Sequence, residues 1–238
     1  MAEKRAHWHE QLAGEGSARL VFVDESGANT KMTRWHGRSP SDQRLVAEVP
    51  HGHYQTSTLI SAVRLNGPCA PWLFEGAMAG KMFLAWVSQG LVPTLQKNDL
   101  VIMDNLATHK VQGIREAIET AGARLLYLPP YSPDFNPIEN MWSKIKQSLR
   151  SLAPRTQAEL IAAAKLAFNA ITPADCHGFF LHAQYTIWFM EMLYPLLCHT
   201  IGPPPATLFS RRLQTGCNCK DWLNFHGKWP FLLTLHCV

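Results

Sequence analysis

The stretch Pro129-Pro-Tyr-Ser-Pro-Asp-Phe-Asn-Pro-Ile-Glu-Asn-Met-Trp-Ser-Lys-Ile-Lys146 joins a stiff loop to the start of a helix. Four of its first nine residues are prolines, and each proline fixes its own φ and restricts the residue before it. The segment Asn136-Pro-Ile-Glu139 has the pattern of an N-cap, a first helical proline and a capping glutamate. The sequence therefore predicts a helix over 137–152 that carries Glu139 at the end of a rigid loop.

Two apolar runs upstream each end in an aspartate. They are Arg19-Leu-Val-Phe-Val-Asp24 and Leu100-Val-Ile-Met-Asp104, and both have the composition of buried strands. Strands that are apolar on both faces belong to parallel or mixed sheets covered by helices, where ligands bind at the carboxyl ends. If the two strands are neighbours, about 4.8 Å apart, their terminal carboxylates can bind the same cation.

Each acid also has an ordinary structural explanation. Asp24 and Asp104 could close Asx turns, and Glu25 is as well placed as Asp24. Glu139 could serve only as a capping glutamate, in a cap that stabilises its helix by about 1 kcal/mol. Taken together, however, three carboxylates suit a reaction in which two divalent metals bind the attacking and leaving oxygens of a phosphodiester.

The helix predicted over 137–152 supports this interpretation. Its flank beside the apolar stripe holds Glu139, Lys146 and Arg150 at offsets of seven and eleven residues. We predict that Lys146 and Arg150, with the nearby Lys144, contact DNA phosphates, although a solvated basic helix face would look the same. The stripe itself consists of Ile138, Met141, Ile145, Leu149 and Leu152.

Length and composition set further bounds. The 238 residues carry a formal charge of +4 with 17% charged residues, which is compatible with a polyanionic partner. The six cysteines lack paired CxxC spacing and are expected to be reduced thiols. The N-terminus has no apolar signal core, and the most apolar late run is too short to span a membrane. We therefore expect a cytoplasmic protein without a membrane anchor.

The chain pattern predicts an α/β plan with a mixed five-stranded sheet flanked by helices. The strands are expected at 19–24, 30–36, 56–65, 100–104 and 124–128, and helices at 81–95, 111–121, 137–152 and 157–171. Residues 186–238, which show no sustained periodicity, are expected to form an irregular extension after the main domain at 19–185.

The quoted motifs resemble the catalytic domain of insertion sequence 630 family transposases, within the mariner superfamily. They are Phe22-Val-Asp-Glu-Ser-Gly27, Met103-Asp-Asn-Leu-Ala-Thr-His-Lys110 and Leu128 to Glu139. Asp104 and Glu139 are separated by 34 residues, the interval that the family uses between its second and third catalytic acids. The segment Val49-Pro-His-Gly-His-Tyr54 and the pair Ala70-Pro-Trp72 are similar too.

The resemblance implies a ribonuclease H-like fold and a catalytic and metal-binding triad of Asp24, Asp104 and Glu139. It implies two Mg²⁺ ions, with Mn²⁺ as a substitute, for hydrolysis at the element's end and attack of the freed 3′-hydroxyl on target DNA. Asn105 and His109 match family positions and are expected to orient DNA or the metal ligands. The implied partners are transposon-end and target DNA, with a homodimer on DNA in the bacterial cytoplasm at the nucleoid.

Two departures from the family pattern affect the functional prediction. Residues 1–18 replace the helix-turn-helix region of such transposases and are expected to be a residual linker, so a separate upstream reading frame could supply that region. Residues 186–238 look like read-through into non-coding sequence. The alternatives are a catalytically inactive fragment that binds DNA or dimerises, and a ribonuclease H-like nuclease.

Overall fold

The computed structural model describes residues 5–12, 14–34, 36–46 and 48–185. Its centre is a mixed five-stranded sheet in the order β3-β2-β1-β4-β5. β1 pairs antiparallel with β2 and parallel with β4, while β2–β3 is antiparallel and β4–β5 is parallel. The strands are β1 (Leu20–Asn29), β2 (Thr56–Arg64), β3 (Gly67–Glu75), β4 (Leu100–Met103) and β5 (Arg124–Tyr127).

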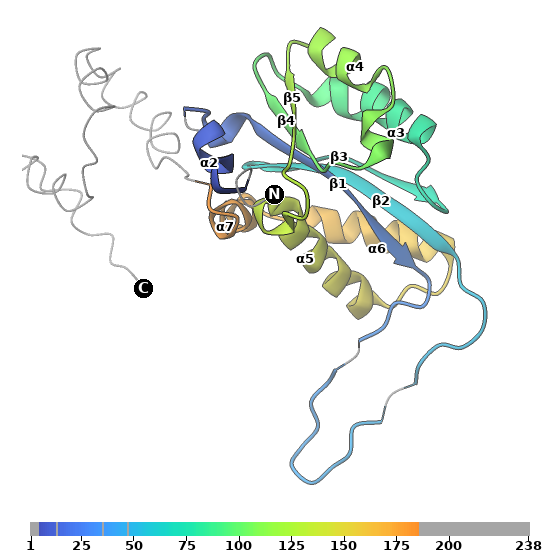
Figure 1. Cartoon of the computed structure of the whole chain (residues 1–238). Helices are drawn as coiled ribbons and strands as arrows, with labels where there is room; N and C mark the ends of the chain where they lie inside the picture. Colours follow the sequence, from blue (N-terminus) through green and yellow to red (C-terminus); the bar gives the residue numbers. More distant parts are fainter. Residues whose placement is uncertain (1–4, 13, 35, 47, 186–238) are drawn as a thin grey trace, which may run out of the picture. The chain divides into compact units, whose positions relative to one another are not determined.

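Helices cover both faces of this sheet (Figure 1). The side chains of β1 alternate between the faces, so that Phe22 packs in one apolar cluster and Val21 and Val23 in the other. The first cluster contains the helices α5 (Pro137–Leu152), α6 (Gln157–Asn169) and α7 (Pro173–His182). The second contains α3 (Gly80–Trp86), the π-turn η2 (Val87–Leu91) and α4 (Ile114–Thr120). The predicted mixed α/β sheet flanked by helices is confirmed.

One of the five predicted strands is wrong. Residues 30–34 and 36 form no strand, and the third strand of the antiparallel meander is β3. Pro68 and Pro71 concealed β3, because proline cannot donate to a sheet ladder and is confined to edge strands and bulges. β3 is an edge strand, and its register with β2 shifts between Ile60 and Ala62.

The other predicted elements are present, α5 with the predicted bounds and the rest with shifted ends. The helix predicted over 81–95 is α3 followed by η2 and the 3₁₀ turn η3 (Val92–Thr94), and the one predicted over 111–121 begins only at Ile114. α7 was not predicted. Four members of the α5 stripe are buried, but Leu152 is 47% exposed because it lies in the last helical position, beyond the sheet.

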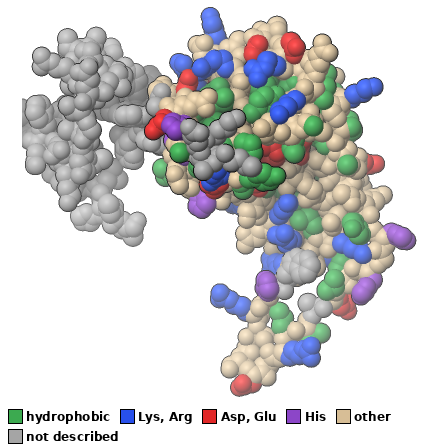
Figure 2. All heavy atoms as spheres, in the orientation of Figure 1, with side chains coloured by type: hydrophobic (Ala, Val, Ile, Leu, Met, Phe, Trp, Pro, Cys, Tyr) green, Lys and Arg blue, Asp and Glu red, His purple; other side chains and the backbone are tan. Residues whose placement is uncertain are grey.

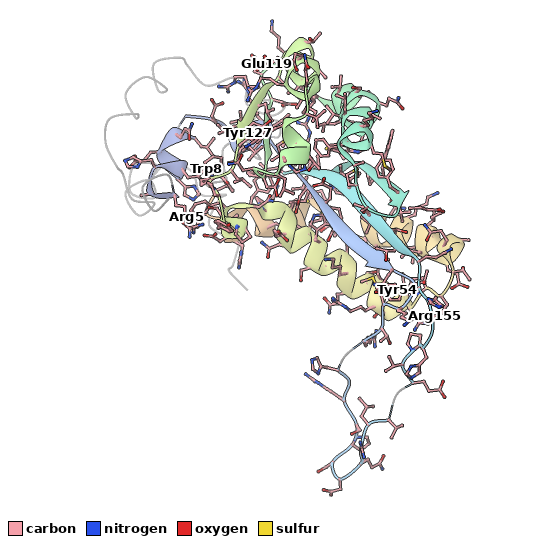
Figure 3. The ribbon with its side chains drawn as sticks, turned by 45° about the vertical axis from the view of Figure 1, so that its right-hand side comes forward. Arg5, Trp8, Tyr54, Glu119, Tyr127 and Arg155 are labelled. Atoms are coloured by element: carbon pink, nitrogen blue, oxygen red, sulfur yellow. The ribbon has the colours of Figure 1, made fainter. Side chains whose placement is uncertain are left out.

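The segment before β1 packs onto the domain, with the short helix α2 (Trp8–Gln11) and the 3₁₀ turn η1 (Ser17–Arg19). Trp8 is buried, and its indole N–H donates to the hydroxyl of Tyr185 at 2.8 Å. That hydroxyl donates in turn to the Phe135 carbonyl at 2.7 Å, and Arg5 contacts Asp134 at 2.7 Å. Figure 3 shows Arg5 and Trp8 together beside the start of α5. Arg5 and Trp8 therefore attach this segment to the residues around the start of α5.

Three other predictions concern the C-terminal extension, the cysteines and membrane-spanning helices. The predicted extension 186–238 lies outside it. The two cysteines that the structure describes, Cys69 and Cys176, are both free thiols. Over the described ranges, no helix has the length and apolar character that crossing a membrane requires.

Candidate active site

Asp24 and Asp104 lie side by side at the edge where parallel pairing ends. The last paired residues of β1 and β4 are Val23 and Met103, and each aspartate is the next residue along its strand. β1 nevertheless continues, because its residues beyond Val23 still pair with β2, and Asp24 lies opposite Ser61. Asp24 is thus inside a strand and closes no Asx turn, whereas Asp104 does, since its Oδ1 accepts from the Leu106 N–H at 3.2 Å.

Glu139 follows β5 along the chain and lies in the first turn of α5. Tyr127 of β5 pairs with Met103, and the chain then enters the proline-rich loop, which contains the 3₁₀ turn η5 (Pro133–Phe135). Asn136 is the N-cap residue of α5, as predicted, but its side chain makes no capping hydrogen bond, and no capping box forms with Glu139. The proposed capping role of this glutamate is therefore wrong, and its exposed carboxylate is available for other contacts.

The three predicted acids interact electrostatically. The pKa of Asp24 rises from 3.8 to about 8, first because of burial and next because of the negative charge of Glu139. A backbone hydrogen bond from Glu25 opposes the rise, while the charges of Glu25 and Asp104 add to it. Charges influence one another mainly over short distances or through poorly solvated space. The fold therefore gathers these carboxylates into one region of negative potential.

His109, in the 3₁₀ turn η4 (Ala107–Lys110), joins two carboxylates of this region. Its Nδ1 lies 2.5 Å from Asp104 Oδ1, and its Nε2 lies 2.9 Å from Glu25 Oε2. Burial alone would lower the pKa of His109, but the hydrogen bonds and charges of Asp104 and Glu25 outweigh it and raise the pKa to about 10. The imidazole is fully buried and stacks near Phe83, with ring centroids 4.3 Å apart.

This arrangement separates two predicted roles of His109. A fully buried ring offers no surface for DNA in this conformation, so a direct DNA contact does not fit the structure. Its hydrogen bond to Asp104 instead suits the orientation of that carboxylate.

Strand alternation explains why Glu25 and Asp24 have different environments. Leu20 and Phe22 face the α5 side, so Asp24 faces it too, whereas Val21, Val23 and Glu25 face the α3 side. Glu25 therefore meets His109 and not Glu139. The sequence placed Glu25 as a rival of Asp24, and the period of two was the signal that could have separated them.

The remaining predicted DNA contacts differ in their surroundings. Lys144 forms an ion pair with Asp175 at 2.6 Å, with its side chain 41% exposed. Lys146 and Arg150 are half-buried on α5 and form no ion pair within the described ranges, and Asn105 is exposed directly after Asp104. Lys146 and Arg150 are therefore the predicted cations that have their charge available for a ligand.

The chemistry of the site fits a divalent cation. Carboxylate oxygens are the ligands that Mg²⁺ prefers, and it usually takes one or two of them together with water and substrate phosphates. Within the described residues, no group of three or more His, Cys, Asp or Glu side chains is arranged to hold a metal ion. Oδ1 of Asp104 already contacts His109. The donors left for a cation are the other oxygen of Asp104 and the carboxylates of Asp24 and Glu139.

Comparison with solved structures shows a related fold in Mos1 transposase. Similar structures include the Mos1 strand transfer complex, with a TM-score of 0.60, 15% identity and coverage of 76% of this chain and 56% of that chain. The pre-cleavage Mos1 transpososome gives 0.59 and 12%, covering 76% and 58%. The catalytic domain of Mos1 mariner transposase gives 0.55 and 14%, covering 76% and 86%.

The present chain thus spans less than two thirds of the Mos1 chains in the DNA complexes and most of the isolated catalytic domain. At these identities the likeness is one of fold. A search of curated proteins finds no match. The family described as DDE superfamily endonuclease matches residues 19–161, which include Asp24, Asp104 and Glu139. Because this match spans more than half of the sequence, the chain belongs to the DDE superfamily endonuclease family.

Proposed function

We propose that this chain is the catalytic domain of a DDE transposase that cuts and joins DNA during transposition of an insertion sequence. The observation that carries the proposal is the position of Asp24 and Asp104, each directly after the last paired residue of the neighbouring parallel strands β1 and β4, with the charge of Glu139 acting on the buried Asp24. A cluster of carboxylates that raises the pKa of one member destabilises the metal-free protein. That cost has a physical reason if the acids together bind cations.

The residues of the chain have separate roles in this proposal. Asp24, Asp104 and Glu139 bind metal, while His109 holds Asp104 in orientation from its buried position between two carboxylates. The proline-rich loop fixes the approach of α5, and Arg5 and Tyr185 hold that loop in place. Two divalent ions would supply stabilisation of the attacking and leaving oxygens of the phosphodiester. Lys146 and Arg150 would bind neighbouring phosphates.

The cofactor proposal is two Mg²⁺ ions, with Mn²⁺ as a substitute. Related solved structures support it, because the Mos1 catalytic domain has been determined with Mg and with Mn. The proposed partners are transposon-end and target DNA, as the Mos1 transpososome and strand transfer structures suggest by analogy. Membership of the insertion sequence 630 group, a homodimer on DNA and a helix-turn-helix protein from a separate frame complete the proposal.

The decisive experiment supplies the purified chain with labelled duplexes taken from the DNA on both sides of its gene. We expect Mg²⁺-dependent nicking at one position, and its loss in Asp104→Asn. Asp42→Asn is the matched control, because Asp42 is exposed in the loop between β1 and β2. Cleavage that survives in Asp104→Asn, or equal cleavage of an RNA–DNA hybrid in competition, would overturn the transposase assignment.

A further inference from the structure

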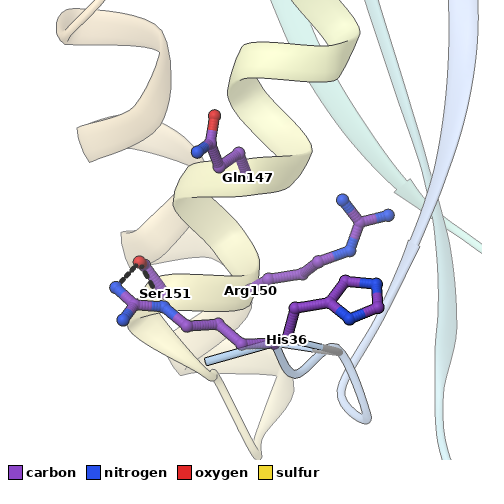
Figure 4. A pocket seen from close by; sticks show the side chains of 5 residues that line it. His36, Gln147, Arg150 and Ser151 are labelled. Carbon is purple, nitrogen blue, oxygen red and sulfur yellow. Dashed lines mark hydrogen bonds between the residues drawn. The ribbon is translucent and has the colours of Figure 1, made fainter. Parts of the chain in front are cut away.

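A basic pocket lies beside the C-terminal half of α5, away from the acids. It has a volume of about 510 Å³ and is lined by Arg34, His36, Gln147, Arg150 and Ser151, which we call the α5 basic pocket. Figure 4 shows the side chains of Arg150 and His36 next to each other, with Arg34 bonded to Ser151. Among the residues that the structure describes, no acidic side chain lines it. The pocket therefore offers cations and hydrogen-bond donors to an anion.

The pocket is held together by contacts between two distant segments. Arg34 Nε donates to Ser151 Oγ at 3.0 Å, and a second N–H of the same guanidinium donates to that oxygen. Arg155, just beyond α5, donates to the carbonyls of Met32 at 2.9 Å and Thr30 at 3.4 Å. Figure 3 shows Arg155 at the base of the long loop, close to Tyr54. The start of the β1–β2 loop is thus fastened to the end of α5.

The charges of the pocket are largely uncompensated. Arg150 and His36 make no hydrogen bond or ion pair with any other described residue, and Arg34 bonds only to the neutral Ser151. The loop at 30–55 contains four Lys or Arg and three His residues against two acids, so its field is positive. Figure 2 shows these basic side chains along the loop and on the surface next to it.

A favourable interaction with the helix dipole explains a cation near the end of α5, but not all of these features. Arg150 alone would satisfy that explanation. It does not account for Arg34 and His36, which come from a different segment and converge on the same hollow. Bringing like charges together costs free energy unless an anion is bound between them.

The pocket residue Arg150 and the acid Glu139 lie on the same flank of α5. Arg150 follows Glu139 by eleven residues, which is about three turns of α5, so both lie on one flank about 16 Å apart along the helix axis. Lys146 occupies the same flank between them. A DNA strand that follows this flank would bring a phosphate close to the reacting one past Lys146 to Arg150.

We propose that the α5 basic pocket binds a backbone phosphate of the same DNA strand, a few nucleotides from the phosphodiester that reacts at Asp24, Asp104 and Glu139. This inference rests on the proposed function, because it assumes that the acids bind the reacting phosphodiester. The strand then follows α5 from Glu139 past Lys146 to Arg150. Arg34 and His36 bind the phosphate from the side of the loop.

The first test measures binding of a mixed-sequence DNA duplex by the full chain over a range of salt concentrations. We expect Arg150→Gln and Arg34→Gln each to weaken binding about tenfold and to reduce the salt slope by about one. The matched control is Lys97→Gln, because Lys97 is exposed before β4 at the opposite ends of the parallel strands. Equal affinities and salt slopes for the pocket variants and the control would refute phosphate binding by the α5 basic pocket.

The second test locates the phosphate. After the nicked position has been mapped in a duplex, single phosphates on either side are replaced by uncharged methylphosphonates. One replacement within a few nucleotides of the nick should weaken binding to the wild type and have no further effect in Arg150→Gln, which would show that the two groups interact. Additive losses at every position would refute the contact.

The outcomes also separate this inference from the proposed function. Metal-dependent nicking by the wild type with no effect of Arg34→Gln or Arg150→Gln would remove the pocket and leave the transposase assignment. Pocket-dependent DNA binding without nicking of any duplex would remove the catalytic assignment and leave the phosphate site.

Discussion

Asp24→Asn should stabilise the metal-free protein, although the residue is proposed to be essential for activity. The carboxyl group of Asp24 has a pKa of about 8 in the folded chain and 3.8 as its reference value. The folded protein therefore retains a proton that the unfolded chain releases between these two pH values. Stability falls as the pH rises through this interval, because the unfolded state binds fewer protons.

The size of the stabilisation by Asp24→Asn follows from the difference between the folded and reference pKa values of Asp24. Each pH unit between the two pKa values costs about 1.4 kcal/mol of unfolding free energy, which amounts to roughly 4 kcal/mol at about pH 7. Asparagine has the same shape and carries no charge, so it avoids this loss. In a domain of this size, 1 kcal/mol corresponds to about 2–4 °C in Tm, so the variant should melt roughly 8–16 °C higher.

The assay compares urea and thermal unfolding of the wild type and Asp24→Asn with EDTA present. At about pH 4 the two proteins should have nearly equal stability, and the gap should widen steadily up to about pH 8. His109 stays protonated in the folded chain over this range because its pKa is about 10, and Asp24 is not among the groups that shift that pKa, so its effect cancels in the difference. Adding Mg²⁺ at the higher pH should stabilise the wild type and leave the variant unchanged.

The reasoning fails if Asp24→Asn is less stable than the wild type at about pH 8 without metal, or if the difference is independent of pH. Either result would show that burial and the charges of Glu139 and Asp104 do not raise the pKa of Asp24 in the folded chain. Ser61→Ala serves as a control, since Ser61 lies opposite Asp24 on β2 and carries no charge.

Three further substitutions test contacts of the fold: the His109 pairing at the site, the packing of Trp8, and the ion pair of Arg64 with Asp99 at the other end of the sheet. His109→Leu leaves two carboxylates without their partner, so we expect a loss of about 3–5 kcal/mol in urea unfolding, and an unchanged midpoint would contradict this role. Trp8→Ala should cost about 3–5 kcal/mol by thermal unfolding, because it empties a buried volume, and an unchanged Tm would contradict this packing. Arg64→Met leaves Asp99 unpaired at 2% exposure and should cost about 3–5 kcal/mol in urea unfolding. Combining it with Asp99→Asn should recover part of that loss, and a double variant that is no better than the single one would refute the pairing.

The parts of the site that could be predicted are those encoded by local pattern. Apolar runs ending in Asp24 and Asp104 indicated neighbouring strands, and the pairing of Val23 with Met103 confirms that they are neighbours. The proline-rich loop and the helix after it also follow from local rules, because proline limits φ wherever it occurs. Glu139 was therefore placed at the start of α5 without any knowledge of the tertiary fold.

Other features required the folded chain. β3 was hidden by its prolines, since only the position of a strand in the sheet decides whether a missing donor matters. The pairing of His109 with Glu25 joins residues 84 positions apart, and no local pattern predicts it. The same holds for the contact of Trp8 with Tyr185 and for the meeting of Arg34 with Ser151.

The sequence by itself indicated the apolar parts of β1 and β4 that lead to Asp24 and Asp104, and the whole of α5, because these depend on apolar patterning and on the geometry of proline. Only the tertiary structure decided which charged groups share one poorly solvated space. The pKa of Asp24, the partners of His109 and the convergence of Arg34 on Arg150 depend on distances between segments far apart in the chain. Electrostatic interactions depend on separation and solvent exposure, which the order of residues does not contain.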